Sequence, residues 1–160
     1  MPASAALRVF MSVGRNASIA EQVRAMLSIA DNECHVSARG GADSLLVAGE
    51  RSQTMRRCEA AVIVITSEDA AGGEEADGLG LGLTIEICAA EVLYGGRVAL
   101  VCEEGLRLPR ALDSLPRFTF GGGGLTLDVG IDLMKAAKDF QRRAPRRHDG
   151  AREGRADAGR

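Results

Sequence analysis

Aromatic residues are scarce in this sequence, which has no tryptophan, one tyrosine and four phenylalanines among its 160 residues. Few rings are therefore present to stack on a nucleobase or a nicotinamide. The sequence also lacks any run approaching the roughly 18 apolar residues of a membrane span. Its first residues, MPASAALRVF, have neither the basic segment nor the apolar length of a signal peptide. We expect a soluble, cytoplasmic protein without a membrane partner.

Metal and phosphate motifs are absent as well. The four cysteines form no CxxC pair. The two histidines lie on a peripheral strand and in the tail, where neither has a visible Cys, Asp or Ser partner, so a zinc site or a catalytic triad is not expected. The cysteines are best explained as reduced, mostly buried thiols. Neither GxxxxGK[ST] nor GxGxxG occurs, which argues against a phosphate-binding loop and a dinucleotide-binding Rossmann site.

Positive charge is concentrated at the end of the chain. Residues 1–140 hold 13 Lys and Arg against 19 Asp and Glu, whereas residues 141–160 hold seven Arg and three acids. The acidic part is a poor nucleic-acid binder. The arginine-rich part, QRRAPRRHDGAREGRADAGR, has no apolar periodicity. We therefore predict one domain at 1–140 and a disordered tail at 141–160.

The remaining pattern alternates apolar strands with amphipathic helices. The run AAVIVIT at 60–66 has no polar alternation, which is typical of a central strand covered on both faces. Alternating elements of this kind favour a flavodoxin-like three-layer α/β/α fold with a five-stranded parallel sheet. The predicted strands are 7–12, 32–37, 60–66, 97–102 and 117–120, and the predicted helices are 17–30, 43–58, 82–94 and 125–140.

Local signals add detail to this outline. Ser18 and Glu21 have the spacing of a capping box at the start of the first helix. SEDAAGGEEADGLG at 67–80 has no periodicity and predicts a long mobile loop. GGGG at 121–124 is most simply a flexible connection. In the last helix, the residues expected to face inward are Leu127, Ile131, Leu133 and Met134.

Polar residues follow three of the predicted strands. In an open parallel sheet, ligands bind outside the carboxyl ends of the strands. Here that edge is formed by residues 12–16, 66–69 and 103–105. Taken alone, the acidic pairs at 68–69 and 103–104 are most simply explained as solvated turn residues.

Glu86 is the unusual carboxylate of the sequence because it lies in the apolar helix GLTIEICAAEVLY. On a helical wheel, one apolar face contains Ile85, Cys88, Ala89, Val92 and Leu93. Glu86 lies at the edge of that face, near the helix start, and Glu91 lies on the far side. Glu86 is thus expected at the boundary between core and solvent. It is either a site residue or an ordinary glutamate of the first turns.

The order of motifs over residues 7–120 resembles a known family. The similarity is to the TIR-like (Toll/interleukin-1 receptor-like) predicted nucleotide-binding domains of bacterial anti-phage effectors, which are related to bacterial TIR NAD glycohydrolases. The motifs that carry it are Phe10-Met11-Ser12-Val13-Gly14-Arg15, Thr66-Ser67-Glu68-Asp69, Gly82-Leu83-Thr84-Ile85-Glu86, Glu103-Glu104-Gly105 and Leu108-Pro109. The chain departs from the family at Gly82, where an asparagine is usual, at Val13, where a histidine is common, and at Arg110-Ala111 in place of Ser-Asp.

The resemblance implies cleavage of the bond between nicotinamide and ribose, with NAD as substrate and no metal or bound cofactor. Glu86 would be the catalytic carboxylate. Substrate-binding residues would be Ser12, Gly14 and Arg15 at the first turn and Thr66, Ser67 and Asp69 on the opposite wall. It also implies self-association or a separate sensor protein as partner.

Two other functions remain open. The departures from the family pattern and the shortage of aromatic residues fit a catalytically inactive interaction or assembly module. A nucleoside deoxyribosyltransferase-like enzyme would share the sheet and a catalytic glutamate, but would need a nucleobase pocket that no motif marks.

Overall fold

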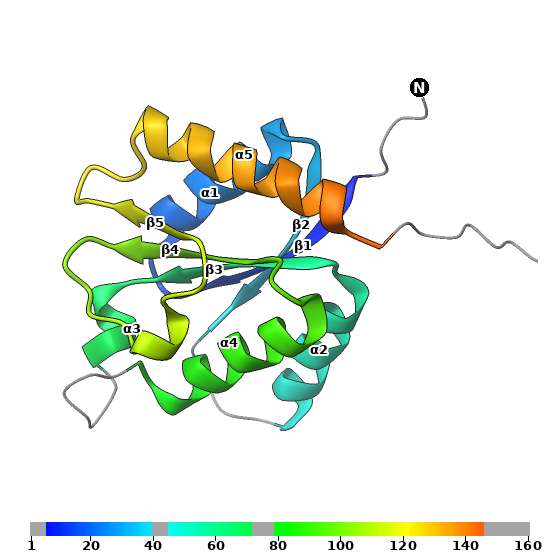
Figure 1. Cartoon of the computed structure of the whole chain (residues 1–160). Coiled ribbons are helices and arrows are strands. Elements are labelled where there is room, and N and C mark those ends of the chain that lie inside the picture. Colours follow the sequence, from blue (N-terminus) through cyan, green and yellow to red (C-terminus); the bar gives the residue numbers. More distant parts are fainter. Residues whose placement is uncertain (1–5, 40–44, 72–78, 146–160) are drawn as a thin grey trace, which may run out of the picture.

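Strands and helices alternate along the chain in the computed structural model, which describes residues 6–39, 45–71 and 79–145 (Figure 1). The predicted alternation is confirmed. The elements are β1 Leu7–Val13, α1 Ala17–Ile29, β2 Asn32–Ala38, α2 Leu45–Arg57, β3 Ala60–Ile65, α3 Ser67–Ala71, α4 Leu81–Tyr94, β4 Val98–Glu103, the 3-10 turn η1 Arg110–Leu112, β5 Arg117–Phe120 and α5 Leu127–Arg143.

All five strands run parallel in one sheet, in the order β2-β1-β3-β4-β5. This is the flavodoxin-like arrangement that the sequence predicts. β3 lies in the middle, and each of its six residues is buried. Its unbroken run of apolar side chains therefore reflects helices packed on both faces of the sheet.

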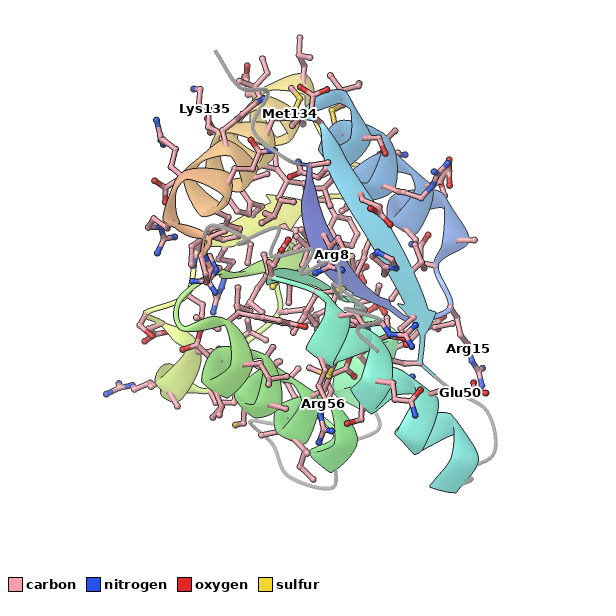
Figure 2. All side chains as sticks on the ribbon, turned by 90° about the vertical axis from the view of Figure 1, so that its right-hand side faces the viewer. Arg8, Arg15, Glu50, Arg56, Met134 and Lys135 are labelled. Carbon is pink, nitrogen blue, oxygen red and sulfur yellow. The ribbon has the colours of Figure 1, made fainter. Side chains whose placement is uncertain are left out.

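Helices α1 and α5 cover one face of the sheet, and α2 and α4 cover the other (Figure 1). Figure 2 shows the same layers with side chains, with Met134 of α5 and Arg56 of α2 on opposite sides of the sheet. Alternate residues of each strand point to opposite faces, so Val62 and Val64 join the core under α1 and α5. Ile63 and Ile65 join the core under α2 and α4.

The first helix begins earlier than its predicted capping box. Asn16 is the N-cap of α1, and its side chain accepts a hydrogen bond from the backbone N–H of Ile19 at 3.2 Å. Ser18 therefore lies inside the helix, and Glu21 pairs with Arg24 on the surface. The capping-box prediction at Ser18 and Glu21 is wrong because Asn16 supplies the cap two residues earlier.

Two predicted connections are more regular than expected. Residues 67–71, predicted as the start of a mobile loop, form the short helix α3, while residues 72–78 lie outside the described part of the chain. In the glycine run, the N–H of Gly124 donates to the carbonyl of Gly121 at 3.0 Å. The run is thus a hydrogen-bonded turn between β5 and α5.

The last helix differs from the prediction at both ends. Leu127, predicted to face inward, follows the N-cap Thr126 and is 71% exposed, whereas Leu133 and Phe140 are buried. α5 continues to Arg143, so residues 141–143 belong to the fold and not to the tail. The amide of Gln141 donates to the carbonyl of Ala30 at 3.0 Å. Residues 146–160 of the predicted tail lie outside the described part.

Candidate functional site

The carboxyl ends of β1 and β3 lie side by side. From β1 the chain continues to β2 on one side of this pair, and from β3 it continues to β4 on the other side. In this sheet order, the crevice between β1 and β3 is the topological switch point, where ligands of open α/β sheets bind. β1 ends next to Gly14, and β3 ends next to Thr66. The structure thereby brings together two segments that the sequence placed at one edge.

An arginine that the sequence did not single out fills this crevice. Arg39 follows the last residue of β2, and its guanidinium reaches past the end of β1. Its NH1 donates to Ser12 Oγ at 2.7 Å, and its NH2 donates to Asp69 Oδ2 at 3.0 Å and to the carbonyl of Val64. The Arg39 side chain is only 10% exposed. Ser12 and Asp69, both predicted site residues, are therefore joined through Arg39.

Thr66 and Asp69 are joined by hydrogen bonds at the start of α3. Asp69 Oδ2 accepts hydrogen bonds from the backbone N–H of Thr66 at 2.8 Å and from its hydroxyl at 3.1 Å. The N–H of Asp69 donates in return to the carbonyl of Thr66 at 3.1 Å. Thr66 is 4% exposed. The Thr-x-x-Asp spacing in the predicted turn was the signal for this helix start.

Gly14 allows Asp69 to approach the first turn. A Cβ at position 14 would lie 3.1 Å from Asp69 Oδ1, which is tighter than most contacts between side chains. Gly14 therefore belongs to the same cluster as Ser12 and Asp69. Arg15, the next residue, is exposed and lies at the outer margin of the molecule, away from that cluster (Figure 2).

Ser67 links the crevice to the next strand. Its side chain is exposed, and its backbone N–H donates to Glu103 Oε2 at 2.6 Å. Glu103 is the last residue of β4, so one of the two strand-end acidic pairs anchors the start of α3. Glu68, in the other pair, is an exposed residue of the first turn of α3.

Glu86 is buried more deeply than the helical wheel predicts, with 6% of its surface exposed. Its Oε2 lies 3.4 Å from NH1 of Arg51, a residue of α2. Arg51 is itself held at the end of β2, where its Nε donates to Ser37 Oγ at 3.1 Å and its NH2 to the carbonyl of Ala38 at 2.7 Å. The other carboxylate oxygen, Glu86 Oε1, is buried and finds no hydrogen-bond partner among the described residues.

The buried face of α4 is the opposite of the predicted one. Leu83, Ile87, Ala90 and Tyr94 pack into the core beside Glu86. Of the predicted inward face, only Ala89 packs against the core, and the exposed residues are Ile85, Cys88, Val92 and Leu93. Glu91, predicted on the side of the helix away from the core, is half-buried and has a buried Oε1. α4 is apolar on nearly its whole circumference, so its sequence pattern does not identify the face that meets the sheet.

The end of β2 connects the two groups of polar residues. Ala38 accepts a hydrogen bond from Arg51, which pairs with Glu86, and the adjacent Arg39 reaches the crevice between β1 and β3. The candidate site thus has two parts, the Arg39 cluster over β1 and β3 and the Glu86–Arg51 pair between α2 and α4.

The four thiols differ in burial and reactivity. Burial raises the pKa of the Cys58 and Cys102 thiols to about 11 each, which keeps them protonated at neutral pH. Cys58 and Cys102 are buried, Cys34 is half-buried and Cys88 is exposed. Among the described residues, no group of three His, Cys, Asp or Glu side chains is placed to hold a metal ion.

The comparisons with known proteins add no identification. No protein-family model matches the chain, and neither does any curated protein. The resemblance to TIR-like domains stays a prediction that depends on the motifs and their order. No helix of the described residues is long and apolar enough to cross a membrane.

Proposed function

We propose that this protein is an N-glycosidase that cleaves the nicotinamide–ribose bond of NAD, with Glu86 as the catalytic carboxylate. One observation carries the proposal: a carboxylate that is 6% exposed keeps one oxygen without a hydrogen-bond partner among the described residues, beside the carboxyl edge of a flavodoxin-like sheet. A buried polar atom without a partner is uncommon in a folded domain and marks a candidate site.

The reaction requires little from the protein except a carboxylate held close to the ribose. The pyridinium ring of NAD is already cationic, so the bond to ribose breaks with its electron pair going to nicotinamide, which leaves neutral. The ribose then carries an oxocarbenium-like positive charge, which a nearby carboxylate stabilises. Water adds to that carbon and releases a proton, which gives ADP-ribose. Glu86 Oε1 would face the ribose, while Arg51 holds Oε2.

Substrate binding would require Arg39 and Glu86 to become more accessible. The Arg39 guanidinium fills the crevice where the pyrophosphate would lie. If Arg39 released the Val64 carbonyl and donated to phosphate oxygens instead, that space would open. Ser12, Gly14, Thr66, Ser67 and Asp69 would line it. We therefore place the enzyme in a resting state that a partner or self-association converts. By the same resemblance, it would act in the bacterial cytoplasm in anti-phage defence.

A second candidate function is a non-catalytic assembly module. The observation that favours it is the pairing of the charged groups with one another, Arg39 with Asp69 and Arg51 with Glu86. In that case the two ion pairs only fix the end of β2 against its neighbours, and no nucleotide is bound.

Incubation of the purified protein with NAD, at several protein concentrations and with chromatographic detection of nicotinamide, separates the two functions. The enzyme hypothesis predicts nicotinamide release that Glu86→Gln reduces at least about 100-fold, because the neutral amide does not supply the charge of the transition state. Glu91→Gln, on the same helix, is the matched control and should keep the activity. Equal rates in the two variants would refute the role of Glu86, and an inactive parent protein would favour the module.

A further inference from the structure

The guanidinium of Arg51 is held mainly by the end of β2. Its Nε donates to Ser37 Oγ at 3.1 Å, and its NH2 donates to the carbonyl of Ala38 at 2.7 Å. Only NH1 reaches Glu86, at 3.4 Å from Oε2. Because a guanidinium is planar, its three nitrogens have fixed directions relative to one another. The end of β2 therefore determines where NH1 lies beside the Glu86 carboxylate.

The contact between Arg51 and Glu86 is one-sided. An arginine that neutralises a buried carboxylate frequently donates to both carboxylate oxygens through two parallel hydrogen bonds. Here Arg51 contacts Oε2 alone, while Oε1 is buried and has no hydrogen-bond partner among the described residues. A buried oxygen without a partner lowers the stability of a folded chain. The arrangement thus stabilises the fold less than a two-sided pair would, and it leaves one oxygen free for another molecule.

Nothing on α4 itself orients the Glu86 carboxylate. The last torsion of a glutamate side chain has only broad preferences, so the carboxylate rotates unless a partner holds it. The residues one turn away on the helix have no side chain that can form a hydrogen bond, and they are Gly82, Leu83, Ala89 and Ala90. Among the described residues, Arg51 is the only basic side chain in ion-pair contact with Glu86.

We propose that Arg51 is a positioning residue, which holds Glu86 Oε2 so that Oε1 faces the ribose of the substrate. The inference rests on the proposed function, because it assigns Arg51 a role in that reaction. Arg51 acts through Glu86 and not by binding NAD. A reacting group that is displaced by about 1 Å can slow a reaction about 100-fold, so the orientation of this carboxylate affects the rate directly.

Thermal unfolding tests the pairing without any need for turnover. Arg51→Met leaves Glu86 buried without its cation, so the midpoint should fall by at least about 5 °C. Adding Glu86→Gln to Arg51→Met removes the unpaired charge and should restore most of that loss. In the background of Arg56→Met, at an exposed arginine of the same helix, Glu86→Gln should raise the midpoint far less. Equal changes in the two backgrounds would show that Arg51 is not the partner of Glu86 in solution, and the inference would fail.

Arg51→Lys separates orientation from charge. Lysine keeps a positive charge near Glu86, but its single ammonium nitrogen does not replace the three separated nitrogens of the guanidinium. The kcat for nicotinamide release should fall at least about tenfold, while KM should change by less than about threefold, because the lost interaction acts in the transition state and not in substrate binding. Arg56→Lys is the matched control and should keep both constants. Circular dichroism of each variant gives the folded fraction to which the rates are normalised.

The possible outcomes of these assays are distinct. A parental kcat in Arg51→Lys would show that charge alone is sufficient and would overturn the positioning role. A higher KM with a parental kcat would mean that Arg51 binds the substrate, which also contradicts the inference. Both results leave the proposed function intact, because the parent protein still releases nicotinamide. A parent protein that releases none refutes the proposed function, and the role of Arg51 is then refuted with it.

Discussion

Two buried thiols couple the stability of the domain to pH. Cys58 and Cys102 are 7% and 2% exposed, and burial raises the pKa of each to about 11 from an ordinary value near 9. The unfolded chain therefore loses these protons before the folded chain does. The resulting stabilisation is complete below pH 9 and is lost as the pH rises towards 11.

We expect the free energy of unfolding to fall by about 1 kcal/mol for each of these thiols between pH 8 and pH 10. Urea unfolding at the two pH values measures the change. Cys102→Ala should be less stable at pH 8, because it leaves a cavity, but should lose about 1 kcal/mol less than the parent protein on going to pH 10. If Cys102→Ala and the parent protein lost the same free energy, burial of Cys102 would not resist its ionisation.

At the scale of elements, the turn between β5 and α5 depends on one glycine of four. Gly124 has a φ of +88°, and a Cβ there would clash with the side-chain amide of Gln22. Gln22 Oε1 accepts the N–H of Leu125 at 2.8 Å, which ties the start of α5 to α1. Gly123 has open space around its Cα. The glycines of this run therefore serve different purposes.

Gly124→Ala should destabilise the domain by about 1 to 2 kcal/mol, because alanine disfavours positive φ and its methyl group displaces Gln22. Gly123→Ala is the matched control and should change the stability by less than about 0.5 kcal/mol. Thermal unfolding of the two variants, followed by circular dichroism, tests the difference. Similar midpoints would mean that the turn adapts to a side chain at position 124.

At the scale of the whole molecule, α5 is hydrogen-bonded to the rest of the domain up to its last turn. Gln141 Nε2 donates to the carbonyl of Ala30 and to Asn32 Oδ1, each at 3.0 Å, and so joins α5 to the connection between α1 and β2. Arg143 reaches the carbonyl of Gly96 at 3.4 Å. The polar composition of residues 146–160 offers nothing comparable to bury.

Two shortened chains should therefore differ in thermal stability. A chain that ends at Pro145 should keep the midpoint of the parent protein. One that ends at Phe140 should unfold roughly 3 to 6 °C lower, because it loses the Gln141 hydrogen bonds and the last turn of α5. Differential scanning calorimetry measures both. An equal shift in the two chains would show that the arginine-rich end docks on the domain.

The sequence alone determined the order of elements and the sheet. Unbroken β-branched runs such as Ala60–Ile65 and the helical spacing between them are local properties of the chain. Right-handed crossovers and burial on both faces leave few ways to assemble such units. The parallel sheet, with the carboxyl ends of β1 and β3 at one edge, follows from them. Glu86 was also recognisable from the sequence alone, because it is a carboxylate within an otherwise apolar helix.

The tertiary structure decided which face of α4 is buried and what fills the crevice. A helix that is apolar on nearly all sides has two acceptable orientations, and only its fit against β3, β4 and α2 selects the one that buries Glu86 and exposes Val92. The sequence did not identify Arg39 as a site residue, because its partners, Ser12 and Asp69, are 27 and 30 residues away in the chain. A long side chain finds such partners only after the strands have placed them within its reach.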